Sequence, residues 1–225
     1  MLTGEQYRLL LEGAWVTVQV SALSILIGTV IALIGGISIL ARSRLLRTFT
    51  RVYVELFRGV AAAILLFWAA FSLPLLLGVT LTVWQAGIIA LSINMGAYGT
   101  EVVRGAIQSI PPGQTEAAIA VNLTNAQRLR HVIIPQALVT MLPPYGNLSI
   151  EVMKASALVS TVGLTDLLRR AQSMRTNRVA DSIDIFVATL MMYFVIAQVI
   201  RLVVSLLERR FGRGLDIGRM SRLAK

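Results

Sequence analysis

The sequence predicts an all-α integral membrane bundle of about five transmembrane helices, and three observations support this. First, 56% of the 225 residues are hydrophobic and only 14% are charged, whereas an average soluble domain carries roughly 25% charged residues. Second, uncharged runs recur that are long enough to cross a bilayer, which takes about 20 mostly apolar residues. Third, the net charge is +10, as expected when cations gather between spans on one side of a membrane.

The composition also excludes several classes of function. The lack of cysteine rules out a disulfide framework and cysteine-ligated metal or redox sites. The single histidine, His131, leaves little room for a metal centre or a catalytic triad. No catalytic constellation occurs at usable spacing, so we do not expect an enzyme. A phosphate-binding loop needs Gly-Lys-Ser/Thr, but the only lysines are Lys154 and Lys225, after Met153 and Ala224.

The first predicted span covers residues 15–40, the first long stretch without a charged residue. The segment before it has no positive region of the kind that opens a cleavable signal peptide. Gly28, Ala32 and Gly36 recur at every fourth position. They therefore share one helix face, which either packs closely against another helix or faces lipid.

The next uncharged stretch, residues 59–100, is long enough for two spans, predicted over 59–77 and 83–105. Pro74 and Gly78 predict the turn between them. The basic segment before residue 59 is assigned to the inner connection between the first and second spans.

A fourth span is predicted over 133–162 and a fifth over 185–207. The fourth contains Pro143 and Pro144, and we expect it to be broken or kinked there. The whole chain, residues 1–225, is thus interpreted as one transmembrane domain.

Five spans place the two termini on opposite sides of the membrane. The segments on the side of the N-terminus hold five arginines, whereas those on the other side hold 13 arginines and lysines. Cations favour the cytosolic side, so we expect the N-terminus outside and the C-terminus in the cytosol. Four of the outer arginines lie between Arg169 and Arg178. They form either a surface for an acidic partner or a solvated face.

The loop between the third and fourth spans, residues 109–135, carries the most specific pattern. Pro111 to Gly113 predict a stiff turn that precedes a short helix over 114–121. Asn122 suits the left-handed position that ends such a helix. Thr124 and Gln127 have the spacing of a capping box, which predicts a second short helix.

The first of these short helices is expected to expose Glu116 and to bury two small side chains, Ala117 and Ala118. This pattern resembles the cytoplasmic signature of permease subunits of ABC importers, which reads Glu-Ala-Ala, three residues, Gly, nine residues, Ile-x-Leu-Pro. Asn122 stands at the glycine position, where it is the least damaging substitute because it tolerates the left-handed conformation. The matching residues are Glu116, Ala117, Ala118 and Pro135, with conservative replacements at Val132 and Ile134.

Other segments resemble the polar amino-acid branch of these permeases, and together they cover most of residues 14–210. They are Phe57-Arg58-Gly59, residues 94–108 and residues 154–160. That branch usually continues Arg-Gly with Thr-Pro, whereas an apolar run follows here. Residues 141–148, taken with Asn122, look most like ectoine and hydroxyectoine permeases.

The resemblance implies the membrane subunit of an ATP-driven importer in the bacterial inner membrane. The implied partners are two cytosolic ATPase subunits, a second permease copy or a sister permease, an extracytoplasmic substrate-binding protein and membrane lipid, but no nucleic acid. No cofactor is expected in this chain, and ATP and magnesium would bind to the ATPase. The implied ATPase-coupling residues are Gly113, Glu116, Ala117, Ala118, Asn122 and Pro135.

Polar residues inside spans are candidates for the substrate path because they are expensive in lipid. Asn94 and Tyr98 share one face of the third span, and Glu101 and Arg104 continue it. Glu101 and Arg104 form either a structural pair near the cytosolic border or a substrate contact. We assign Arg58 with them to a structural or gating role.

On the fourth span, Asn147, Glu151 and Lys154 share one face. We expect Pro143 and Pro144 to unwind the helix before them and to free backbone carbonyls for a ligand. Glu151 and Lys154 either bind the two charges of a zwitterion or neutralise each other.

Two rival functions remain at this point. A secondary transporter subunit driven by an ion gradient would use Glu101 or Glu151 as its proton carrier, but it gives no account of the loop at 109–135. A non-transporting membrane scaffold would form no stable complex with an ATPase.

Overall fold

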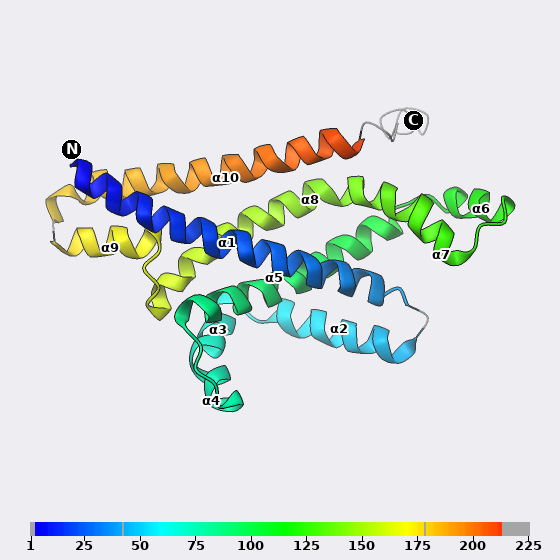
Figure 1. Cartoon of the computed structure of the whole chain (residues 1–225), viewed down its shortest axis with the longest axis horizontal. Helices are drawn as coiled ribbons and strands as arrows, with labels where there is room; N and C mark the ends of the chain where they lie inside the picture. The colour runs from blue at the N-terminus through cyan, green and yellow to red at the C-terminus, as the bar shows by residue number, and fades with distance from the viewer. Residues whose placement is uncertain (1–2, 42, 178, 213–225) are drawn as a thin grey trace.

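The computed structural model describes residues 3–41, 43–177 and 179–212. These ranges are almost entirely helical and contain no strand, so the prediction of an all-α bundle is confirmed. Figure 1 shows the helices in chain order: α1 (Gly4–Ser38), α2 (Arg44–Gly59), α3 (Ala62–Phe67), α4 (Leu73–Leu77), α5 (Val83–Gln108), α6 (Pro112–Ala120), α7 (Asn125–Arg128), α8 (Ile134–Ala155), α9 (Leu167–Asn177) and α10 (Ser182–Gly212).

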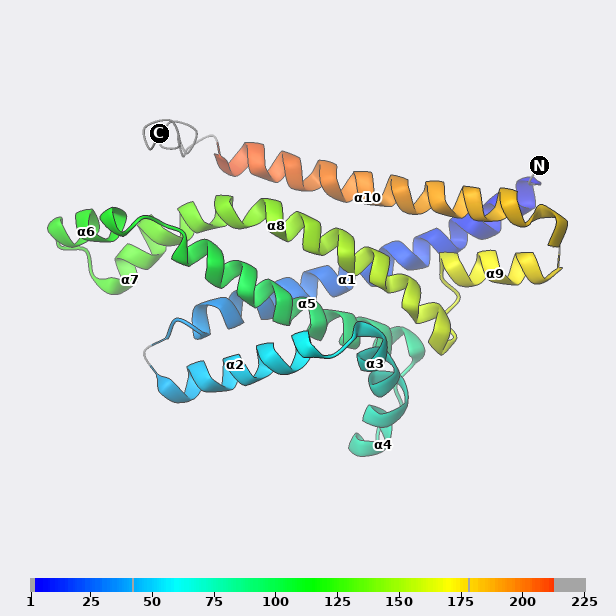
Figure 2. The same cartoon turned by 180° about the vertical axis from the view of Figure 1, so that it is seen from behind.

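The long helices run along one common direction. α1 packs on α5, α5 on α8, and α8 on α10. Figures 1 and 2 show the start of α1 and α9 at one end of the bundle and α6 and α7 at the other. We call the end with α6 and α7 the inner end, because the cation count assigns it to the cytosol.

Three helices of the described chain are long and apolar enough to cross a membrane: α1, α5 and α10. Two bent pairs meet the same criterion when each is taken as one span. The first joins α2 to the segment Ala62–Leu77, with a bend of 103°. The second joins Asn125–Val162 to Leu167–Thr176, with a bend of 49°. The predicted spans over 15–40, 83–105, 133–162 and 185–207 each overlap one of these segments, whereas the predicted span over 59–77 corresponds only to the second half of the first bent pair.

α1 is longer than the predicted span over 15–40, because it begins at Gly4. Thr3 and Gln6 form a capping box that starts it early. Gly28, Ala32 and Gly36 are all buried against α5. A Cβ atom added at Gly28 would lie 2.8 Å from the Cβ of Met95. The small-residue face therefore packs on a helix, and the alternative that it faces lipid is wrong.

The segment before residue 59 is not a loop, which corrects the sequence prediction. It forms the 16-residue helix α2, with Thr50 and Val54 buried. α3, a π-helical turn (Trp68–Ser72) and α4 then replace the predicted span over 59–77. Its arginines made this segment look like a solvated connection, but Arg44, Arg47 and Arg51 occupy one face of the helix and leave another free to pack on α5.

α8 runs without a break through Pro143 and Pro144. The expected unwinding at this point is therefore wrong. The two prolines remove two backbone N–H donors, but the helical hydrogen bonds of the residues on either side maintain the helix. The irregular turns lie at its ends instead, as a π-helical turn over Leu129–Ile133 and a 3₁₀ segment over Ser156–Val162.

Candidate functional site

The α2–α3 pocket forms where the helical backbone is interrupted between α2 and α3. The two residues at the break have extended backbone, so the last carbonyls of α2 lack helical donors. Two side chains of α5 supply them. The amide Nδ2 of Asn94 donates to the carbonyl of Phe57 at 3.2 Å, and the hydroxyl of Tyr98 donates to the carbonyl of Arg58 at 3.2 Å. These bonds fix the break against α5.

The pocket has a volume of about 440 Å³ and contains both signs of charge. Arg58 of α2 and Glu151 of α8 line it, together with Asn94 and Tyr98. The guanidinium of Arg58 lies 5.2 Å from the centroid of the Tyr98 ring, a distance at which the ring face attracts a cation. Most of the remaining lining is aliphatic. The structure thus brings four of the residues singled out from the sequence into one cavity.

Glu101 and Arg104 lie further along α5, outside this pocket. Arg104 donates to Glu101 Oε2 from Nη2 at 2.6 Å and from Nε at 2.9 Å. It also donates to the side chain of Gln108. The predicted pairing of Glu101 with Arg104 is confirmed.

Asn147, Glu151 and Lys154 share an exposed face of α8, as their spacing predicts. Within the described ranges no ion pair joins Glu151 to Lys154. Glu151 lines the α2–α3 pocket, whereas Lys154 lines a different cavity. Asn147 lines neither. The three residues therefore share a face of α8 but do not line one common cavity.

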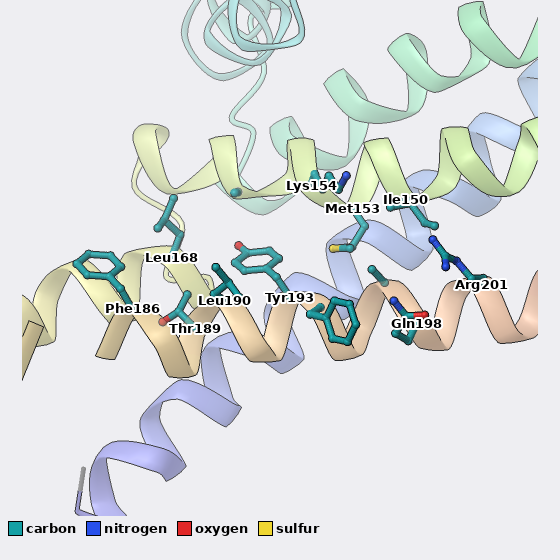
Figure 3. A pocket seen from close by; sticks show the side chains of 13 residues that line it. Ile150, Met153, Lys154, Leu168, Phe186, Thr189, Leu190, Tyr193, Gln198 and Arg201 are labelled. Carbon is teal, nitrogen blue, oxygen red and sulfur yellow. The ribbon is translucent and has the colours of Figure 1, made fainter. Parts of the chain in front are cut away.

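The second cavity lies between α8 and α10 and has a volume of about 660 Å³. Figure 3 shows Lys154 of α8 near the middle of this cavity and Arg201 of α10 at one end, with Tyr193 and Gln198 along α10. The sequence did not predict that these two cations line one cavity. They lie on different predicted spans, and no spacing rule relates their positions.

α9 carries part of the outer arginine cluster. Arg170 forms an ion pair with Glu12 of α1 at 3.5 Å. Arg169 and Arg175 line a hollow of about 400 Å³ with polar residues of the same helix. Arg178 lies outside the described residues.

The inner loop has the geometry that its sequence predicts. Asn122 has a φ of 58°, the one positive value at a non-glycine residue among those described. The backbone N–H of Gln127 donates to Thr124 Oγ1 at 3.3 Å, and the N–H of Thr124 donates to Gln127 Oε1 at 2.9 Å. The left-handed end of α6 and the capping box of α7 are both confirmed.

The exposure of α6 agrees with prediction at two positions and differs at one. Glu116 is exposed and Ala118 is 4% exposed, as expected, but Ala117 is exposed rather than buried. Successive residues of a helix point about 100° apart, so a surface helix does not bury two neighbours on a narrow contact. Gln136 at the start of α8 donates to Gln114 of α6 at 3.1 Å and ties the two helices together.

The two ends of the loop are exposed or partly exposed. Gly113 is exposed in the first turn of α6, and a Cβ atom there would meet no atom within 4 Å. Pro135 lies in the first turn of α8, directly after the π-helical turn over Leu129–Ile133. The loop therefore presents an open surface at the inner end, directly attached to α5 and α8.

A comparison with known families decides what this arrangement belongs to. The sequence pattern of the family described as "Binding-protein-dependent transport system inner membrane component" matches residues 15–213. The chain belongs to this family. Its match includes both the α2–α3 pocket and the inner loop.

Relatives in this permease family carry names from amino-acid transport. A probable amino-acid ABC transporter permease of Sinorhizobium fredii is 41% identical over 202 residues, which cover 88% of this chain and 84% of the relative. A putative glutamine transport permease of Rickettsia felis is 32% identical over 201 residues, covering 89% and 92%. The L-cystine transport permease of Bacillus subtilis is 32% identical over 207 residues, covering 92% and 88%.

Solved structures of permeases share the fold. The crystal structure of an amino acid ABC transporter with histidines contains a chain that is 30% identical, with a TM-score of 0.83. The match covers 93% of this chain and 100% of that one. A chain of the MetNI methionine ABC transporter is 24% identical, with a TM-score of 0.79 over 94% of this chain and all of the other. This second likeness concerns the fold.

Proposed function

We propose that this permease is the membrane-spanning subunit of an ATP-driven importer. Its cargo is a polar amino acid or a zwitterionic compatible solute such as ectoine or hydroxyectoine, moved inward by alternating access. One observation carries the proposal: the inner loop joins α5 to α8, the helices that bring Asn94, Tyr98 and Glu151 to the α2–α3 pocket. A displacement of the loop therefore reaches the pocket through two packed helices.

The energy for this displacement comes from partners. ATP and magnesium bind to two cytosolic ATPase subunits that contact the exposed side of α6, at Glu116 and Ala117. A second permease, either a copy or a sister chain, completes the path. An extracytoplasmic binding protein delivers the cargo, and the name of the family supports this dependence.

The charges in the α2–α3 pocket support a zwitterionic cargo. A carboxylate beside the guanidinium of Arg58 and an ammonium group beside the carboxylate of Glu151 would each form a charge-assisted hydrogen bond. The relatives named for glutamine and cystine transport support an amino acid. Ectoine and hydroxyectoine are zwitterions too, and their assignment rests on residues 141–148 and Asn122.

Uptake of labelled amino acids and ectoine into cells that produce the assembled transporter tests this function. We expect ATP depletion to abolish uptake and an uncoupler to leave most of it. Uptake lost with the uncoupler alone would favour an ion-coupled transporter. A chain that transports nothing and purifies without an ATPase would be a scaffold.

The coupling role of α6 predicts the effect of Ala117→Trp. Ala117 is exposed, so the larger side chain should not disturb the fold, but it should prevent close approach of the ATPase. We expect uptake to fall to background while the chain still inserts, as measured by transport and by co-purification of the ATPase. Ser173→Trp, an exposed position on α9 at the other end, is the control for ATPase binding. Normal docking and uptake in Ala117→Trp would contradict the role of α6.

The pocket predicts that Glu151→Gln and Arg58→Gln impair uptake of a zwitterion. Each change removes one charge-assisted contact, which is worth about 1.5–3 kcal/mol. The expected loss is therefore roughly tenfold or more in the concentration dependence of uptake. Thr140→Val, an exposed change on α8 outside the pocket, is the matched control. If both pocket variants retained wild-type uptake and selectivity, the cargo would not bind there.

A further inference from the structure

α2 carries a charged face that runs along its length. Its charged residues are Arg44, Arg47, Arg51, Glu55 and Arg58. Because successive residues rotate by about 100°, all five fall within an arc of roughly 80°. The face therefore carries four cations and one anion, although it belongs to the first half of a candidate broken span.

The other two faces of α2 are apolar and have different surroundings. Thr50 and Val54 are buried where α2 packs on α5. Leu45, Phe49 and Val52 lie on the opposite side, exposed by 84%, 74% and 57%. The apolar exposed face suits lipid or a partner helix. The charged face suits neither lipid nor an apolar contact.

The charges of this face form no ion pair with one another or with other residues of the described chain. No ion pair there involves Arg44, Arg47, Arg51 or Glu55. Arg44, Arg51 and Glu55 are exposed and Arg47 is half-buried. Ionised side chains at membrane depth are expensive unless they pair or face a water-filled cavity. Since no described residue pairs with these charges, water is the environment that this face requires.

The two ends of the face give it a direction. Arg44 is the first residue of α2, just beyond the end of α1, toward the inner end in Figure 1. Arg58 is at the other end, where it lines the α2–α3 pocket. A helix of 16 residues is about 24 Å long, so the face connects the pocket with the inner end.

We infer that this face of α2 lines a water-filled route from the α2–α3 pocket to the cytosol, and that its excess positive charge attracts the carboxylate of the cargo. The inference rests on the proposed import function. It adds Arg47 and Arg51 to the residues of the substrate path. The sequence had assigned both arginines to a cytosolic connection. Glu55 interrupts the row of cations and prevents a carboxylate from binding tightly along it.

The natural lack of cysteine allows a direct accessibility test. Single-cysteine variants at Arg47 and Arg51 are compared with variants at Phe49 and Val52, which lie at similar depth on the exposed apolar face. All four are produced in the assembled transporter and treated, in inside-out membrane vesicles, with water-soluble thiosulfonate reagents. One reagent is anionic and one is cationic.

We expect the cysteines of the charged face to react at least about tenfold faster than those of the apolar face. Neighbouring arginines raise the reactivity of a thiol toward any reagent, so the ratio of anionic to cationic labelling is the sharper measure. We expect this ratio to be about ten, because the remaining cations attract the anionic reagent. Equal labelling of both faces, or no preference for the anion, would overturn the inference. If none of the four cysteines reacted, a protein partner would cover the charged face, and this result would also overturn the inference.

Transport by charge variants tests the role toward the cargo. Arg51→Gln should lower uptake several-fold, and Arg51→Lys should restore most of it, because only the charge is needed. Wild-type uptake in Arg51→Gln would contradict the inferred attraction between this face and the carboxylate of the cargo. The labelling pattern does not depend on which cargo is carried. Failure of import in the wild type would therefore overturn the proposed function without changing the accessibility result.

Discussion

At the scale of single residues, Asp166 joins three helices near the outer end. It is fully buried, and its Oδ1 accepts from the N–H of Arg169 at 2.9 Å, as the N-cap of α9. Its Oδ2 accepts from the hydroxyl of Tyr193 on α10 at 3.5 Å. The next residue, Leu167, donates its N–H to Thr17 on α1 at 3.2 Å. Burial raises the pKa of this carboxyl group above its ordinary value of 3.8, while the hydrogen bonds oppose the shift.

Asp166→Ala should therefore destabilise the permease by about 1 kcal/mol or more, through the lost cap and the unpaired groups left behind. Asp166→Asn keeps an acceptor and should cost less. Thermal unfolding in detergent measures both. A cost for alanine no larger than that for asparagine would contradict the capping role.

The raised pKa of Asp166 also sets the pH dependence of stability. The native state holds the proton of this carboxyl group more tightly, so stability falls as the pH rises through the folded-state pKa. The melting temperature of the wild type should thus drop, relative to Asp166→Asn, between acidic and neutral pH.

At the scale of elements, the pair α1 and α5 forms the centre of the bundle. Small residues on both helices allow this contact. A Cβ atom at Gly99 of α5 would lie 2.6 Å from the Cβ of Ala32 on α1, so the two helices approach too closely for larger side chains. Every pocket residue on α5 depends on this position, because α1 is the helix on which α5 packs most extensively.

Gly28→Val should destabilise the bundle by about 1–3 kcal/mol, because the added atoms overlap Met95 in a packed contact. The readouts are the melting temperature and the yield of folded protein in detergent. Gly105→Ala on α5 is the matched control, since nothing lies within 4 Å of its added Cβ. We expect that control to be neutral or slightly stabilising. A neutral Gly28→Val would show that α1 and α5 separate more easily than their packing suggests.

At the scale of the whole molecule, the permease separates its chemistry along one direction. The α9 end carries arginines of the outer connection, the middle carries the α2–α3 pocket, and the inner end carries α6 and α7. Placing Arg47 and Arg51 on a helix face rather than in a loop still leaves more than twice as many cations in the inner segments as in the outer ones. We therefore still expect the N-terminus outside and the C-terminus in the cytosol.

Reporter fusions test this orientation. Alkaline phosphatase fused after Asn177, at the end of α9, should be active because it folds only outside the cytosol. A fluorescent protein fused after Lys225 should emit light because it folds inside. The opposite pattern would show that the orientation in the membrane is reversed, with α6 on the side away from a cytosolic ATPase.

The sequence by itself determined the fold class, the helix ends of the inner loop and the shared face of Gly28, Ala32 and Gly36, but it left open whether that face packs on a helix or faces lipid. Each of these features follows from a local or periodic rule: apolar length for spans, a left-handed Asn122 and a capping box for the loop, and a four-residue spacing for the small residues of α1. Such rules concern residues close together in the chain, so the sequence contains all that they need.

Only the tertiary structure decided which polar residues meet. Arg58, Asn94 and Glu151 come from three helices, and their meeting depends on how α2 ends and which carbonyls α5 then satisfies. The same holds for α2, whose charge density made it look like a loop until its packing on α5 gave one face a partner and left the charged face open. Long-range packing sets these relations, because the energy that places a helix comes from its neighbours rather than from its own residues.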